Sequence, residues 1–110
     1  MVQKKNILEF IVILKSLEID EINFNTLSRI HAQIECLDVD LLICYIKESD
    51  VGTQLKESLI SLINTYYDFI DDKINDFDDS DARKYLSILR ENALSIYKNN
   101  YANLLKLCNA

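Results

Sequence analysis

Hydrophobic residues recur along most of this chain at spacings of three and four, the pattern of a helix with one buried face. The pattern predicts five helices, over about residues 4–17, 25–37, 38–46, 53–77 and 80–108. Expected N-terminal caps are Asn25, Asp38 or Asp40, Thr53 and Ser80, and a fray or kink is expected at Asn99 and Asn100. The run 41–46 also has the periodicity of a buried strand, but a helix is favoured because no second strand is available for pairing.

The fourth predicted helix is the longest. Its apolar stripe extends from Leu55 to Phe77, about 23 residues, or ~35 Å at the rise of an α-helix. The chain has one glycine, Gly52, and no proline, and the tight turns of β-structure depend on those two residue types. A chain of 110 residues can bury one core without disulfides or metal. We therefore predict an all-α fold, a four- to five-helix bundle that forms a single domain over residues 1–110.

The longest apolar stretch, Ile7–Leu14, is interrupted by Glu9, so it is too short to span a membrane and a poor match to a signal peptide. The cysteines, Cys36, Cys44 and Cys108, are odd in number and lack the spacing of a disulfide framework. This pattern suggests reduced thiols, each packed as a small hydrophobe in its apolar context. These features predict a cytoplasmic protein without a membrane segment.

The net charge of −6 is concentrated in one short window of the chain. Between residues 66 and 82 there are seven aspartates and a single lysine, whereas acidic and basic residues balance over the remainder. Asp78, Asp79 and Asp81 are explained as residues at the start of the last helix, where acids complement the helix dipole. Asp71, Asp72 and Asp76 fall in the last turns of the fourth helix, where each costs about 0.3–1 kcal/mol. These three acids indicate either a solvated helix end or a binding surface.

Aromatic residues are interleaved with these acids. Tyr66 belongs to the buried stripe, but Tyr67 and Phe69 cannot face the same way, so at least one of them should be partly exposed. Aromatic anchors surrounded by steering charges are typical of protein interfaces. The alternative is that the tyrosines flank the core and only their hydroxyls reach water.

Other chemistries fit the sequence poorly. Asp76, Asp78 and Ser80 match the start of a calcium-binding loop, but Asp81 stands where glycine is needed and Ser87 where glutamate is needed. The single histidine, His31, lies five residues before Cys36 and so on a different helix face, which argues against zinc. No catalytic motif can be assembled, and the basic residues are too dispersed for a nucleic-acid surface. We expect a protein that is not an enzyme and that binds no metal, cofactor or nucleic acid.

The stretch from Tyr66 to Asp72, YYDFIDD, resembles the tyrosine-pair-plus-acid patch of colicin nuclease immunity proteins, without the proline and serine that follow the pair there. In size and helical content the chain is similar to immunity proteins of contact-dependent growth inhibition systems. The resemblance implies an inhibitor that binds a cognate bacterial toxin, often a nuclease with a basic surface. The residues expected to contact that partner are Tyr66, Tyr67, Asp68, Asp71, Asp72, Asp76, Asp78 and Asp79.

Two other functions are kept as alternatives. A helical adaptor or homo-oligomeric structural protein would pair the long stripe between Leu55 and Phe77 with a second copy. An inhibitor of the type found in phages would use its acids to imitate DNA phosphates. The toxin-inhibitor prediction favours a monomer, which distinguishes it from the adaptor.

Overall fold

The computed structural model describes the backbone of residues 2–109 and the side chains of residues 6–107. Its elements are α1 (Val2–Ile19), α2 (Phe24–Glu35), α3 (Val39–Glu48), α4 (Thr53–Tyr66), the π-helix η1 (Tyr67–Asp71), the 3₁₀-helix η2 (Ile74–Asp76) and α5 (Asp79–Asn109). The described residues contain no strand, and about 85% of the chain is helical. The all-α prediction is confirmed, and the strand alternative for residues 41–46 is wrong because they lie in α3.

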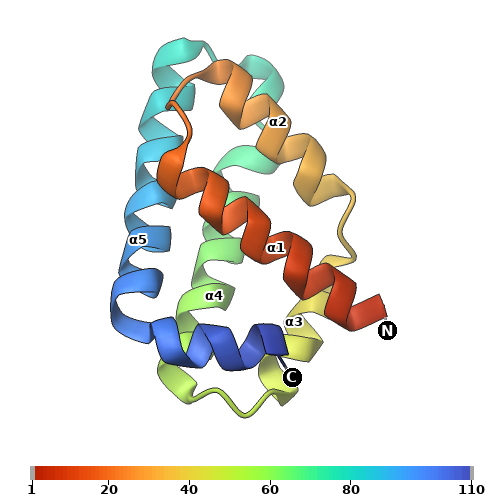
Figure 1. The fold of residues 1–110 in the computed structure, drawn as a ribbon. Helices are drawn as coiled ribbons and strands as arrows, with labels where there is room; N and C mark the ends of the chain where they lie inside the picture. The colour runs from red at the N-terminus through yellow and green to blue at the C-terminus, as the bar shows by residue number, and fades with distance from the viewer. Residues whose placement is uncertain (1, 110) are drawn as a thin grey trace.

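The helices pack around a single apolar core. Figure 1 shows α4 beside the first part of α5, with α1 crossing in front of them and α2 and α3 on one side. α5 bends where Asn100 leaves the helical conformation (φ −135°, ψ 22°), which confirms the expected kink. Each of the five α-helices contributes side chains that are almost fully buried, among them Ile7, Leu14, Leu27, Ile30, Leu42, Ile46, Leu55, Leu59, Leu89 and Leu107.

The predicted fourth helix is too long. The α-helix ends at Tyr66, and the chain continues through η1, a turn and η2 before α5 begins. The residue types account for this ending, since aspartates are poor helix formers and are repelled by the partial negative charge of a helix C-terminus. Even so, the stripe stays against the core, with Tyr66, Ile70 and Ile74 buried and Phe77 half-buried. The stripe is therefore part of the core of one chain and is not available for pairing with a second copy.

Three of the predicted caps are wrong. Asn23, not Asn25, caps α2, because its side chain accepts a hydrogen bond from the Thr26 amide at 2.9 Å. Gly52 precedes α4 with φ +92°, a conformation that favours glycine, so Thr53 is the first helical residue and not the cap. Asp78 replaces Ser80 at the start of α5. The fourth expectation is confirmed, since Asp38 caps α3 by accepting from the Leu41 amide at 3.1 Å.

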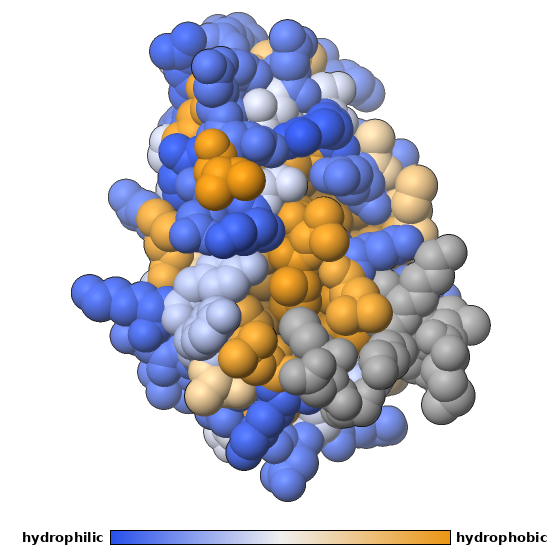
Figure 2. Space-filling view, in the orientation of Figure 1, coloured by the Kyte–Doolittle hydropathy of each residue, from blue (hydrophilic) through white to orange (hydrophobic). Residues whose placement is uncertain are grey.

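Two features of the surface stand out, and the first contradicts a sequence-based expectation. Cys36 and Cys44 are free and exposed, so the expected packing of these thiols in apolar surroundings is wrong, while Cys108 lies outside the described side chains. α1 also exposes Leu8, Val12 and Ile19, and Figure 2 shows hydrophobic residues gathered in the middle of the face that this helix crosses. None of the described helices is long and apolar enough to cross a membrane.

Candidate functional site

The predicted acidic window folds into two parts with different surroundings. The first part is η1 and the segment that follows it, where Asp68, Asp72 and Asp76 are exposed. No ion pair involving these three carboxylates occurs in the described part of the chain. Because no ion pair neutralises these three carboxylates, this end of the protein carries a local excess of negative charge.

The second part, at the start of α5, has a structural role. Asp78 and Asp81 form a reciprocal cap in which each carboxylate accepts a hydrogen bond from the backbone amide of the other, at 2.8 and 3.2 Å. Asp79 accepts from the Phe24 amide at 3.0 Å and from the Arg83 guanidinium at 2.7 Å. These bonds lower the pKa of Asp79, the backbone bond most strongly. Asp78 and Asp79 were both predicted to contact a partner, and the structure places them in bonds that join α5 to itself and to α2.

The two tyrosines of the predicted patch have separate positions. Tyr66 is buried, whereas Tyr67 is half-buried, with its ring edge-on to that of Tyr66 at a centroid distance of 5.1 Å. Burial raises the pKa of both hydroxyls, and the neighbouring charge of Asp71 raises both further. Glu35 and Asp40 also raise the pKa of Tyr67, so acids of α2, α3 and η1 all act on this side chain.

Phe69 lies on the side of η1 that faces α5. Its ring is 49% exposed and stacks against Tyr85 at 6.4 Å, with the Lys73 ammonium 6.0 Å from its centroid. The expectation that Tyr67 or Phe69 would be partly exposed is therefore confirmed for both residues. Aromatic residues are enriched at protein interfaces, where surrounding charges steer association.

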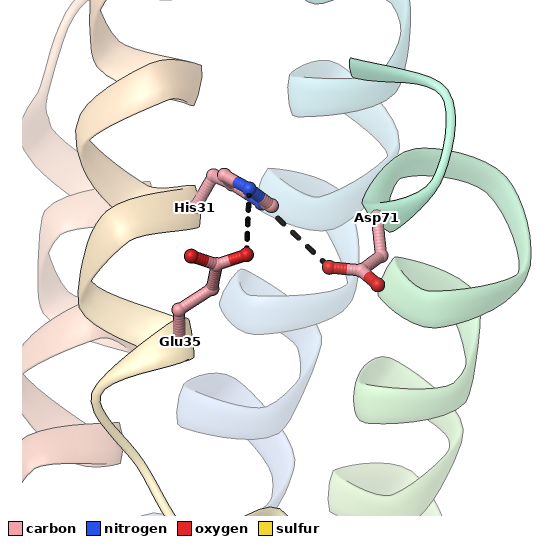
Figure 3. A group of neighbouring side chains, drawn as sticks. All are labelled: His31, Glu35 and Asp71. Carbon is pink, nitrogen blue, oxygen red and sulfur yellow. Dashed lines mark ion pairs between the residues drawn. The ribbon is translucent and has the colours of Figure 1, made fainter. Parts of the chain in front are cut away.

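His31 joins α2 to η1. Its Nδ1 atom is hydrogen-bonded to the Tyr66 hydroxyl and lies 3.7 Å from Asp71 Oδ1, and its Nε2 atom lies 3.1 Å from Glu35 Oε1 (Figure 3). The sequence-based exclusion of zinc rested on the spacing of His31 and Cys36, whereas the spacing of four between His31 and Glu35 places those two side chains on one helix face. Asp71 could not be found from sequence, because its approach depends on the π-helical backbone.

An open groove lies next to this cluster, with a volume of about 760 Å³. Its polar rim includes Asp38, Asp40, Asn64 and Tyr67, and its apolar lining comes from α3 and α4. The position of the α2–α3 link at the rim is fixed by the buried Asn6, whose side-chain amide accepts from the Asp38 amide at 3.3 Å and donates to the Asp38 carbonyl at 3.4 Å. The groove thus extends the negative surface from η1 towards α3.

Fold and surface together define an all-α protein with a negatively charged end formed by η1 and the adjoining helix termini. Comparison with protein-family models, with curated proteins and with solved structures finds no match to this chain.

Proposed function

We propose that the protein binds and inhibits a basic protein partner through an acidic surface composed of Asp68, Asp72, Asp76, Tyr67 and Phe69. The single observation that carries the proposal is the exposure of the three aspartates without an ion pair in the described part of the chain. Charges left unneutralised at a helix C-terminus cost local stability. A partner with a complementary positive surface would neutralise them and would associate faster because of them.

The two aromatic side chains would supply contact area within this field of charge. Tyr67 lies on the flank of η1 that faces α2 and α3, and Phe69 lies on the flank that faces α5. Both are partly ordered by ring contacts in the free protein, so little side-chain entropy would be lost when a partner covers them. The immunity-protein resemblance supports a nuclease toxin as the partner, since a nuclease has a positive surface for its substrate. The proposal assigns the protein no catalytic activity of its own.

The test uses two variants with the same net charge. Asp68→Lys/Asp72→Lys/Asp76→Lys reverses the acidic surface, and the matched control Glu48→Lys/Asp50→Lys/Glu57→Lys reverses three other exposed acids. Asp71 is left unchanged because it contacts His31, so that its reversal would also disturb packing. The immobilised wild-type protein is used to capture its partner from native extract, and binding is then measured by calorimetry with the purified partner.

Wild-type and control proteins should bind the partner with similar affinity, and the surface variant should bind roughly a hundredfold more weakly or not at all. Equal binding by the surface variant would show that these acids are not the interface. The captured protein should also hydrolyse RNA or DNA, and that activity should be lost on adding the wild-type chain. An unchanged activity would exclude inhibition. Displacement of the chain by duplex DNA would indicate the DNA-mimic alternative within the same class of inhibitor.

The adaptor or homo-oligomer alternative now rests on α1, because the long stripe is buried. The exposed residues Leu8 and Val12 are one helical turn apart and could cover the same surface of a second molecule. Sedimentation equilibrium distinguishes the two functions. A dimer that dissociates in the Val12→Lys variant would favour the adaptor, and a monomer at all concentrations would exclude it.

A further inference from the structure

Three potential metal ligands converge at the junction of α2 and η1. His31 and Glu35 extend from the same face of α2, and Asp71 approaches from η1 (Figure 3). One ligand atom from each side chain lies within 4.8 Å of the other two. Ligand atoms around a tetrahedral ion with bonds of about 2.1 Å are about 3.4 Å apart, so the side chains would need to close by at most about 1.4 Å. Rotation of the Glu35 and Asp71 side chains can supply such a movement.

The π-helix is the reason that Asp71 takes part. In an α-helix, residues five positions apart point in directions that differ by about 140°. In a π-helix the hydrogen bonds run between residues five apart, which brings such residues roughly one above the other. Tyr66 and Asp71 have this spacing, and both side chains reach His31. π-Helical turns are costly and occur frequently at functional sites. The π-helical placement of Asp71 is therefore stronger evidence for a ligand site than a cluster of exposed acids on a regular helix would be.

The charges of the cluster also favour a cation. Two carboxylates face one imidazole, and neither Glu35 nor Asp71 pairs with a lysine or arginine in the described residues. Tyr66 holds the imidazole ring by its hydrogen bond to Nδ1, and Nε2 is directed towards Glu35. Asp71 lies beside Nδ1 and would turn towards Nε2 when an ion binds there. Hydrogen bonding of the second ring nitrogen is the usual way in which proteins orient a metal-binding histidine.

We propose that His31, Glu35 and Asp71 bind a divalent transition-metal ion of the zinc type, with water completing its coordination. The imidazole nitrogen selects against calcium and magnesium, which prefer ligand sets made of oxygen alone. One histidine and two carboxylates at bond lengths of about 2.0–2.2 Å suit zinc with an open fourth position. The ion would link α2 to η1, two elements held together here by side chains. The proposal differs from the sequence-based expectation that the chain binds no metal, and the titration below decides between them.

The test is calorimetric titration of the EDTA-treated full-length protein with zinc chloride, in parallel with cobalt(II) absorption spectroscopy. We expect one zinc ion per chain, micromolar affinity and a rise of several degrees in the melting temperature at saturating zinc. Glu35→Gln is the informative variant, because Glu35 is 63% exposed and its replacement should not disturb folding. It should weaken binding at least tenfold, and the matched control Glu57→Gln should not.

The exposed thiols need a separate control, since Cys36 directly follows Glu35 and thiolates bind zinc. The cysteine-free variant C36S/C44S/C108S should bind zinc with unchanged affinity, and its cobalt complex should show visible bands without thiolate charge transfer. Binding that is lost in this variant, that is unchanged in Glu35→Gln, or that is undetectable at millimolar zinc would overturn the proposal. None of these variants alters Asp68, Asp72 or Asp76, so the metal site and the acidic surface are tested separately.

Discussion

Arg90 offers the sharpest test of how the helices that support the site are held in place. The Arg90 Nε atom donates to the Leu17 carbonyl at 2.6 Å, and an Nη atom donates to the Asp20 carbonyl. The last four carbonyls of a helix have no partner within it, and Leu17 carries one of those of α1. The guanidinium therefore satisfies the end of α1, complements its dipole and fixes the link that leads into α2.

The magnitude follows from these two bonds. A hydrogen bond to a charged group contributes about 1.5–3 kcal/mol, but both bonds are only partly buried, so water can replace part of the interaction. We expect Arg90→Met, which keeps the apolar stem, to lose about 2–3 kcal/mol of unfolding free energy. In a domain of this size the melting temperature should fall by about 8–15 °C. Arg90→Lys should be intermediate, because a single ammonium cannot reproduce the fork of the guanidinium.

The assay is thermal and guanidinium denaturation followed by far-ultraviolet circular dichroism. Arg83→Met is the matched control: it removes an arginine from the same helix, but its ion pair with Asp79 is exposed, so its loss should change stability little. If Arg90→Met and Arg83→Met unfold at the same denaturant concentration, the carbonyl bonds of Arg90 do not stabilise the protein and the reasoning is refuted.

Three further predictions concern the carboxylate of Asp79, the glycine Gly52 and the two exposed thiols. The pKa of Asp79 is below its ordinary value of 3.8 in the folded state, so its carboxylate contributes stability above that pH and loses it as the pH falls through the folded-state pKa. The difference in unfolding free energy between wild type and Asp79→Asn, measured by urea denaturation, should therefore shrink below about pH 4. A difference that stays constant with pH would show that the hydrogen bonds of Asp79 do not lower its pKa. Gly52→Ala should cost about 1–3 kcal/mol of unfolding free energy in the same assay, because alanine is strained at the positive φ of this position. Steric overlap should add nothing, since the new Cβ would meet only Asn103 Nδ2 at 3.6 Å. Thr53→Ala, the control, should cost much less. Cys36 and Cys44 should react with a thiol reagent in the native protein as fast as in urea, and protection of either would show that it is buried.

The helical architecture could be predicted because the apolar stripes are long and the chain lacks proline. The helix boundaries that were predicted wrongly depend on contacts that residue spacing along the chain does not specify. Asn23 and Asn25 are equally good caps locally, and helix α2 begins at Phe24, whose amide is bonded to Asp79, 55 positions away. Similarly, Asp78 prevails over Ser80 because its cap is reciprocated by Asp81.

For the acidic residues too, some properties can be read from the sequence and others depend on the fold. Their concentration could be read from the sequence, and so could the capping of α5 by some of them. Whether Asp71 points to solvent or to His31 depends on the hydrogen-bond pattern of η1, which residue spacing does not specify. Asp40 acts on Tyr67 and shares the groove with it only because the fold brings α3 close to that side chain.

The π-helix also has a consequence for how this protein can change in length. Backbone hydrogen bonds in a π-helix join residues five apart, whereas those in an α-helix join residues four apart. η1 therefore holds one more residue than an α-helix would between the same two points. A chain with one residue fewer between Tyr66 and Asp71 would place these two side chains four positions apart, where an ordinary α-helix already aligns them. A single-residue deletion here would then keep both partners of His31, whereas an insertion would rotate Asp71 away. Length differences among related sequences should be sought at this step before any substitution is interpreted.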